Sequence, residues 1–320
     1  MIATNNGPFP WRGGVAGRAL EAAIRGGGPA PEEVRLLQDR ATREVIDSQV
    51  AAGLDLVTDG MVRVPDPTAL AVARIGGLEP GPRGEGYPGG GPYTVPVVRA
   101  EVSWNQPILT EDYLFAAQGC PRPVKPVVVG PYTLARLAED RAYGEPMALA
   151  MALAAALNQE LRSLQTAGAT FIQIDEPACL LHPEEFPIFS RIWEVLGRGV
   201  SAPLALHLEG GDAAPLFAGM ARLRRLACLS LDAVRGRAGL AAFAGIGWPE
   251  GLRLGLGVVD GRDARVESAD EIEALVRSIP GLPPPDRILL GTASSLGDLP
   301  ADTAAAKLRS LAETARRLRA

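Results

Sequence analysis

Short runs of apolar residues alternate along the chain with longer segments in which apolar residues recur at helical spacing. The short runs are rich in Val, Ile and Leu, as expected of parallel strands that are buried on both faces. They predict eight strands, at Ile2–Asn5, Leu54–Asp59, Lys125–Val129, Phe171–Asp175, Leu204–Glu209, Cys228–Asp232, Arg253–Val259 and Arg287–Thr292. Eight strands alternating with helices predict an α/β protein, a (β/α)8 TIM barrel.

Proline and glycine mark the ends of the main helical segments. Two long helices are predicted at Pro31–Ala52 and Pro146–Ala167, each followed by a glycine, and a third at Ala301–Arg319. Proline is favoured in the first turn of a helix, and glycine is favoured just after the last.

Residues 62–123 interrupt the alternation and are too long for one strand-to-helix loop. A Gly/Pro-rich run from Gly76 to Pro92 is followed by TVPVVRAEVSW, whose alternation is typical of a strand. We expect a single domain spanning residues 1–320, in which 62–123 form a hairpin and a helix, as an insertion or lid over the barrel mouth.

Charge, hydropathy and cysteine spacing limit the kinds of partner and the cellular location that we expect for this protein. The net charge is −5 and basic residues form no stripe, which argues against a nucleic-acid partner. The start lacks the pattern of a secretory signal, and no apolar run reaches the roughly 18 residues that cross a bilayer, so we expect a cytoplasmic protein without a membrane partner. Cys120, Cys179 and Cys228 are odd in number and widely spaced, and we expect reduced thiols that fill space.

Polar residues follow several predicted strands, at the end where TIM barrels place their active sites. Asp175 and Glu176 end FIQIDEP, and His207 and Glu209 lie on one side of LALHLEGG. Asp232, Asp260 and the segment Thr292–Ser295 follow the next three strands. A ring of acids with one histidine predicts a functional site at this mouth.

A structural role is the alternative for each of these acids. They could cap the following helices or pair with Arg235, Arg262 and Arg265. His182, in LLHPEEF, is expected at the surface.

Five segments together carry a resemblance to a known family: NGPFP, GLDLVTDGMVR, VKPVVVGPYTLA, FIQIDEPA and LGLGVVDGRDARVESADEI. In this order they resemble the catalytic C-terminal barrel domain of cobalamin-independent methionine synthase, with this chain as a divergent single-barrel member. The resemblance implies a methyl or alkyl transferase. Its substrates would be a small thiol such as homocysteine and a methyl donor such as methyltetrahydrofolate, and zinc would hold the thiol as a thiolate.

The family's metal ligands are altered in this chain. An H-x-C pair, a Glu and a Cys correspond to His207, Glu209, Asp232 and Ser294. One ligand is kept, one is shortened and both thiolates are absent. A histidine with two carboxylates is a harder donor set, which suits other divalent metals as well as zinc, and a vacant site is the alternative.

The resemblance also implies roles in substrate binding and catalysis. Asp175 matches the carboxylate that holds the substrate ammonium, and Thr68 stands near the place of the second one. Arg262 replaces the family's acid histidine, and Leu137 replaces a tryptophan that faces folate, which argues against ordinary folate use. The catalytic candidates are therefore Asp175, Glu176 and Arg262, and the substrate-binding candidates are Asp175, Asp59, Thr68 and Asp260.

Three other functions remain open at this point. Single-barrel relatives of the family also use corrinoid-bound methyl groups or open epoxides with a thiol cofactor. A metal-free barrel could perform acid-base or lyase chemistry with Asp175, Glu176, Glu209 and Arg262, or bind a small molecule. Residues 62–123 could instead form a partner-binding face with Trp104, Tyr113 and Phe115, although we favour a lid that excludes water.

Overall fold

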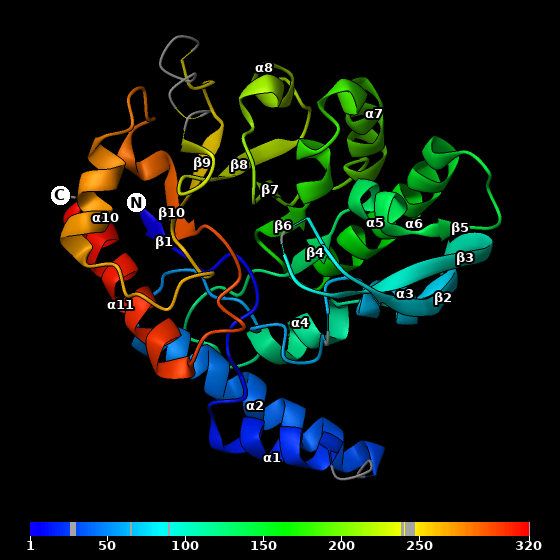
Figure 1. The fold of residues 1–320 in the computed structure, drawn as a ribbon, viewed down its shortest axis with the longest axis horizontal. Coiled ribbons are helices and arrows are strands. Elements are labelled where there is room, and N and C mark those ends of the chain that lie inside the picture. Colours follow the sequence, from blue (N-terminus) through cyan, green and yellow to red (C-terminus); the bar gives the residue numbers. More distant parts are fainter. Residues whose placement is uncertain (26–29, 65, 89, 238–239, 241–246, 320) are drawn as a thin grey trace.

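The strands form a parallel sheet that curls into a barrel (Figure 1). The computed structural model describes residues 1–25, 30–64, 66–88, 90–237, 240 and 247–319. The sheet order is β1-β10-β9-β8-β7-β6-β4. Its strands are β1 (Ile2–Ala3), β4 (Val127–Val129), β6 (Ile172–Asp175), β7 (Leu204–Leu208), β8 (Leu226–Asp232), β9 (Arg253–Val259) and β10 (Ile288–Thr292).

Residues 56–57 close the circle between the first and last strands of this sheet. They form isolated parallel bridges, Leu56 with Thr4 beside β1 and Val57 with Val124 before β4. The predicted second strand, Leu54–Asp59, is therefore present only as these two bridges. The TIM-barrel prediction is confirmed, and the predicted strand positions agree with the structure to within a few residues.

The barrel interior changes from apolar to polar along the strands. At one end Leu56, Phe171, Ala205, Cys228 and Leu289 form a separate buried apolar cluster. Further along the strands the buried residues include Lys125, Gln173, His207 and Ser230. Register pairs Asp175 with His207, and His207 with Ser230, at one level of the barrel. The polar groups thus lie toward the C-terminal ends of the strands, where the sequence predicts the site.

Helices cover the outside of the barrel. They are α1 (Val15–Arg25), α2 (Pro31–Ala51), α3 (Ala69–Arg74), α4 (Thr110–Ala117), α5 (Pro131–Leu137), α6 (Pro146–Thr166), α7 (Phe186–Leu196), α8 (Phe217–Met220), α10 (Ala269–Arg277) and α11 (Ala301–Arg317). Short 3-10 turns are η1 (Pro177–Leu180), η2 (Pro183–Glu185), η3 (Ala214–Leu216) and η4 (Pro285–Arg287). The three predicted helices are confirmed, with ends that differ by at most two residues. Along the described segments, no helix has the length and apolar character required to cross a bilayer.

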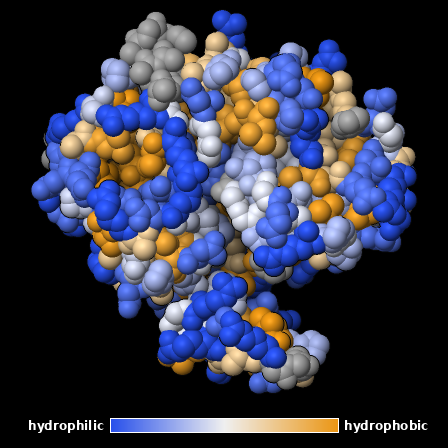
Figure 2. All heavy atoms as spheres, in the orientation of Figure 1, coloured by the Kyte–Doolittle hydropathy of each residue, from blue (hydrophilic) through white to orange (hydrophobic). Residues whose placement is uncertain are grey.

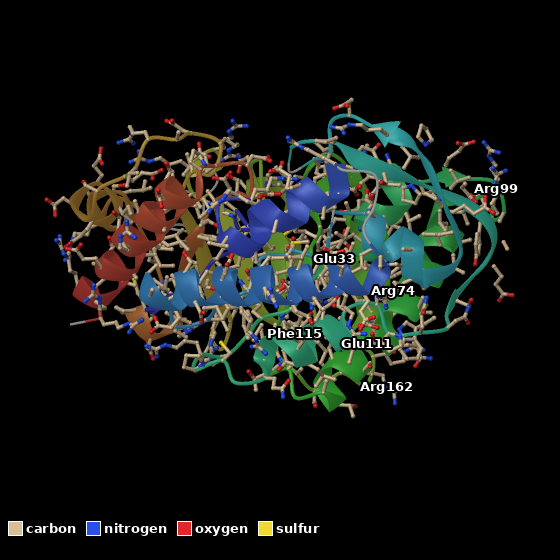
Figure 3. All side chains as sticks on the ribbon, turned by 90° about the horizontal axis from the view of Figure 1, so that it is seen from below. Glu33, Arg74, Arg99, Glu111, Phe115 and Arg162 are labelled. Carbon is tan, nitrogen blue, oxygen red and sulfur yellow. The ribbon has the colours of Figure 1, made fainter. Side chains whose placement is uncertain are left out.

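The pair α1 and α2 projects from one side of the molecule, and its exposed face is largely hydrophilic (Figures 1 and 2). On the other side of α2, Phe115 of α4 lies below the helix in Figure 3. The guanidinium groups of Arg43 and Arg63 lie 4.4 and 4.7 Å from the Phe115 ring centroid. These cation–π contacts fix α4 against α2.

Residues 62–123 fold as α3, an antiparallel hairpin and α4. The hairpin consists of β2 (Ile75–Gly84) and β3 (Tyr93–Trp104), and the short strand β5 (Glu139–Asp140) pairs with β3. The buried carboxylate of Glu160 on α6 anchors this insertion, because it accepts hydrogen bonds from the backbone of residues 108–110 and from Trp104 Nε1.

The three aromatic residues of the alternative partner-binding face each have contacts within the chain. Trp104 is bound to Glu160, Tyr113 is buried, and Phe115 contacts two arginines. These contacts give each aromatic side chain a structural role, and a partner-binding role of the insertion remains a prediction.

Candidate functional site

Asp175 ends β6 at the centre of the polar mouth. Its carboxylate accepts a hydrogen bond of 2.7 Å from Gln173 Nε2. Burial raises the pKa of Asp175 to about 7, while Gln173 and the positive charge of Lys125 oppose that rise. A carboxylate with one neutral partner in such a place is suited to bind a cationic group.

Glu176, the next residue, has a different environment. Its two oxygens accept hydrogen bonds from the backbone amides of Tyr132 at 3.0 Å and Thr133 at 2.7 Å, at the start of α5. A Cβ on Gly130 would lie 2.1 Å from the Glu176 carboxyl carbon, so only glycine fits there. Burial raises the pKa of Glu176 to about 7 against these hydrogen bonds. The geometry supports an anchoring role for Glu176, and its predicted catalytic role remains a prediction.

His207 lies in β7, and Glu209 follows the last residue of that strand. His207 Nδ1 lies 2.9 Å from Ser230 Oγ, and burial with the nearby charge of Lys125 lowers the His207 pKa to about 3, so the ring is neutral. Glu209 has no hydrogen bond or ion pair to any residue that the structure describes. Burial, followed by the charge of Asp175, raises the pKa of Glu209 to about 8.

Arg262 joins the acids at the ends of β8 and β9. Its Nη2 lies 3.0 Å from Asp232 Oδ2, and its Nε lies 2.6 Å from Asp260 Oδ1. Asp232 Oδ1 also accepts the backbone amides of Val234 and Arg235. Ser294 Oγ donates to Asp260 over 3.3 Å. For Asp232 and Asp260 the structure shows the structural role given above as the alternative. Both carboxylates pair with Arg262, and Asp232 also caps the backbone of the following turn.

Asp59 and Thr68, two of the substrate-binding candidates, make their hydrogen bonds to residues outside this group. Asp59 accepts the Met61 amide, and burial raises its pKa, with Asp112 and Arg63 as its charged neighbours. The Thr68 hydroxyl contacts Asp66 and the carbonyl of Thr94, near the loop end of the hairpin. These hydrogen bonds hold the loop and the hairpin, and the predicted contacts of both residues with substrate remain predictions.

Two residues of the mouth were missed by sequence reasoning. Lys125 is fully buried, its Nζ lies 3.1 Å from Asn6 Oδ1, and burial lowers its pKa to about 8. A lysine beside the apolar run PVVV in a predicted interior strand was the available signal. Tyr87 comes from the tip of the hairpin, which the sequence predicts as an insertion or lid over the mouth, although no pattern singles out this residue.

The predicted metal ligands do not converge on one point. His207, Glu209 and Asp232 do not bring three ligand atoms within 4.8 Å of one another in the part of the chain that the structure describes. Both Asp232 oxygens are engaged by an arginine and backbone amides, and the thiolates that zinc prefers are absent. The donor set in this arrangement therefore does not fit a zinc ion, and metal binding at these residues remains a prediction.

One His/Glu group does meet that distance criterion, namely His182, Glu184 and Glu185 in the turn after η1. Arg136 Nη2 lies 3.2 and 2.8 Å from the two ring nitrogens of His182, and its Nη1 lies 3.3 Å from Glu185. A guanidinium already balances this group, which lies on the surface as the sequence predicts.

A barrel whose C-terminal mouth holds two acids with raised pKa values, Asp175 and Glu209, defines an enzyme-like site. Comparison with known proteins gives its family. A family model described as "Cobalamin-independent synthase, N-terminal domain" matches residues 92–281. The chain therefore belongs to the cobalamin-independent methionine synthase family. The matching model is that of the N-terminal domain, whereas the resemblance in the sequence was drawn to the catalytic C-terminal barrel.

Individual relatives align over most of the chain. A protein of Saccharolobus solfataricus named methionine synthase is 29% identical, over 88% of this chain and 84% of the relative. One of the same name from Thermococcus kodakarensis is 28% identical, over 82% and 78%. These relatives confirm the expectation of a methyltransferase-family enzyme.

Solved structures agree with the fold. The B12-independent methionine synthase of Shewanella sp. W3-18-1, in complex with selenomethionine, superposes with a TM-score of 0.82 over 99% of this chain and 97% of that one, at 20% identity. A protein of Listeria monocytogenes described as a vitamin-B12 independent methionine synthase gives 0.79 at 14% identity. At these identities the likeness establishes the architecture alone.

Proposed function

We propose that this protein transfers a methyl group to the sulfur of a small amino-acid thiol, with homocysteine as the first candidate. The observation that carries the proposal is the near end-to-end alignment with relatives named methionine synthase. In the reaction the thiol sulfur forms a bond to the methyl carbon, the bond from that carbon to the donor breaks, and the donor keeps the bonding electron pair. The thiol proton passes to a base.

The charge distribution at the mouth supports an amino-acid substrate. Asp175 has one neutral partner and Glu209 has none among the described residues, while Asp232 and Asp260 are paired with Arg262. The charges of Lys125 and Arg262 offset the burial of Asp175 and Glu209 only in part, since both pKa values stay raised, and a cationic ligand would complete the charge balance. We assign Asp175 and Glu209 to the ammonium group of the substrate.

No step of this proposal passes through a metal ion. The altered donor set does not fit zinc in this arrangement, and the guanidinium of Arg262 supplies the positive charge beside Asp232. Thiol activation is therefore assigned to groups of the chain, in a mouth from which burial excludes most water.

The test is an assay of methionine formation. Protein and homocysteine are incubated with one methyl donor at a time: methyltetrahydrofolate, methylcobalamin or S-methylmethionine. Methionine is then measured by mass spectrometry. Formation with one donor, reduced at least about 100-fold in Asp175→Asn, supports the proposal. Absence of product with all donors, together with absence of homocysteine and methionine binding, contradicts it.

A second function is favoured by the Arg262 network. Because Arg262 neutralises Asp232 and Asp260, the mouth could perform metal-free acid-base or lyase chemistry on another small amine. Binding of simple amino acids without sulfur, as tight as that of methionine, would favour this alternative over methyl transfer to a thiol.

A further inference from the structure

The loop between β2 and β3 returns from the hairpin to the barrel. In Figure 1 it runs toward the ends of β6 and β7. A Cβ on Gly210, just after β7, would lie 3.1 Å from the carbonyl oxygen of Pro88, so the loop rests on the backbone at the mouth. Gly210 also has a φ of +84°, which glycine adopts without strain.

Tyr87 occupies the tip of this loop. Its amide donates to the Gly91 carbonyl at 3.1 Å, which closes a tight turn, and its ring centroid lies 6.3 Å from that of Tyr93. Only 6% of the Tyr87 surface is exposed. The tyrosine is thus covered by the mouth, although it belongs to an insertion far from the barrel strands in sequence.

The surroundings of the Tyr87 phenol are acidic. Burial, followed by the charges of Asp175, Glu209 and Glu176, raises its pKa well above the ordinary value. These acids stand at the ends of β6 and β7, where the Tyr87 loop also contacts Gly210, so the phenol lies near them. The phenol therefore stays neutral and remains a hydrogen-bond donor throughout the physiological pH range.

The Tyr87 hydroxyl makes no hydrogen bond within the described part of the chain. Other tyrosines do: Tyr132 donates to Glu185 at 2.6 Å, and the Tyr143 oxygen accepts the Val102 amide at 2.8 Å. Buried phenol groups usually find a partner. A mostly buried phenol whose hydroxyl has no partner among the described residues, beside the acids that follow β6 and β7, is free to donate to a ligand in the mouth.

We propose that Tyr87 is a substrate-binding residue, whose hydroxyl donates a hydrogen bond to the carboxylate of an amino acid held at Asp175 and Glu209. This inference rests on the proposed function. The charges of the mouth agree with this assignment. A substrate carboxylate near two acids needs a neutral hydrogen-bond donor or a cation, and the Tyr87 phenol is a neutral donor. The loop that carries Tyr87 then covers the bound substrate, and it must lift for exchange.

Tyr93→Phe provides a matched control for Tyr87→Phe. Both changes remove one hydroxyl from the same hairpin, and the two rings are neighbours. Binding of L-methionine and L-homocysteine would be measured by calorimetry on the full chain, with thermal unfolding to verify that each variant is folded.

We expect Tyr87→Phe to weaken binding about 10-fold, as for loss of one hydrogen bond to a charged group, and Tyr93→Phe to stay within about twofold. Wild-type binding that is unchanged in Tyr87→Phe would overturn the inference and leave the proposed function standing. Wild type that binds neither amino acid would contradict the proposed function.

A second measurement needs no ligand. Ultraviolet difference titration of wild type against Tyr87→Phe isolates the ionisation of this one phenol. Ionisation clearly above the ordinary pH of about 10 would support its covered place among the acids, and ionisation at that ordinary pH would overturn that place and the inference with it.

Discussion

Arg262 places its Nη2 atom 3.0 Å from Oδ2 of Asp232, across the ends of two neighbouring strands. Asp232 is the residue that corresponds to a glutamate ligand of the family's metal, so a fixed cation of the protein binds the carboxylate that was expected to bind the metal. The remaining acids of the mouth, Asp175 and Glu209, are left for the substrate.

Removal of this guanidinium should destabilise the protein. Arg262→Ala leaves the buried Asp232 without its countercharge, and we expect a loss of about 2 kcal/mol, less than for a fully buried pair because Arg262 is partly exposed. Urea unfolding measures the change. Arg265→Ala, which breaks the exposed pair with Glu271, should cost under about 0.5 kcal/mol. Equal effects of the two variants would contradict the assignment.

Glu176 should prove important for stability. Glu176→Gln replaces one acceptor oxygen by an amide group that faces a backbone N–H of Tyr132 or Thr133, and we expect a loss of about 1–3 kcal/mol. Glu184→Gln, at an exposed position, is the control and should change little. Unaltered stability of Glu176→Gln, together with lost activity, would instead support the catalytic role predicted from the sequence.

Substitution of Asp175 should weaken substrate binding far more than substitution of Asp59. Asp175→Asn removes a charge from the mouth, and we expect methionine binding to weaken at least about 100-fold. Asp59→Asn should change binding less than about threefold, because its charged neighbours are Asp112 and Arg63. Calorimetry on both variants makes the comparison, and the reverse order would return Asp59 to the substrate site.

Because Lys125 is buried, the free energy of unfolding should rise with pH in the alkaline range. Its pKa is about 8 in the folded chain and ordinarily 10.5, so between these values the unfolded chain binds more protons and stability rises with pH. Relative to Lys125→Met, wild type should gain about 3 kcal/mol from pH 8 to pH 10.5. A difference between the two proteins that stays flat with pH would contradict the buried place of Lys125.

The sequence predicted the barrel well because strand burial and helix period are local signals. FIQIDEP and LALHLEGG placed Asp175, Glu176, His207 and Glu209 at the mouth, since parallel strands end at one edge. Local patterns carry no information about long-range pairing. They could not show that Arg262 pairs with Asp232, thirty residues away, or that Glu176 binds the start of α5. They placed the insertion over the mouth but could not show that Tyr87 is the residue beside the acids.

Metal analysis tests the central claim most directly, namely that the chain's own cation and acids organise the mouth. Protein purified without chelators would be analysed for bound metals beside the His207→Ala variant, and thermal unfolding recorded with added zinc and with chelator. The account predicts well below one ion per chain in both proteins and no shift of the midpoint. About one ion per chain in wild type, lost in His207→Ala, would contradict it and restore the metal-thiolate mechanism.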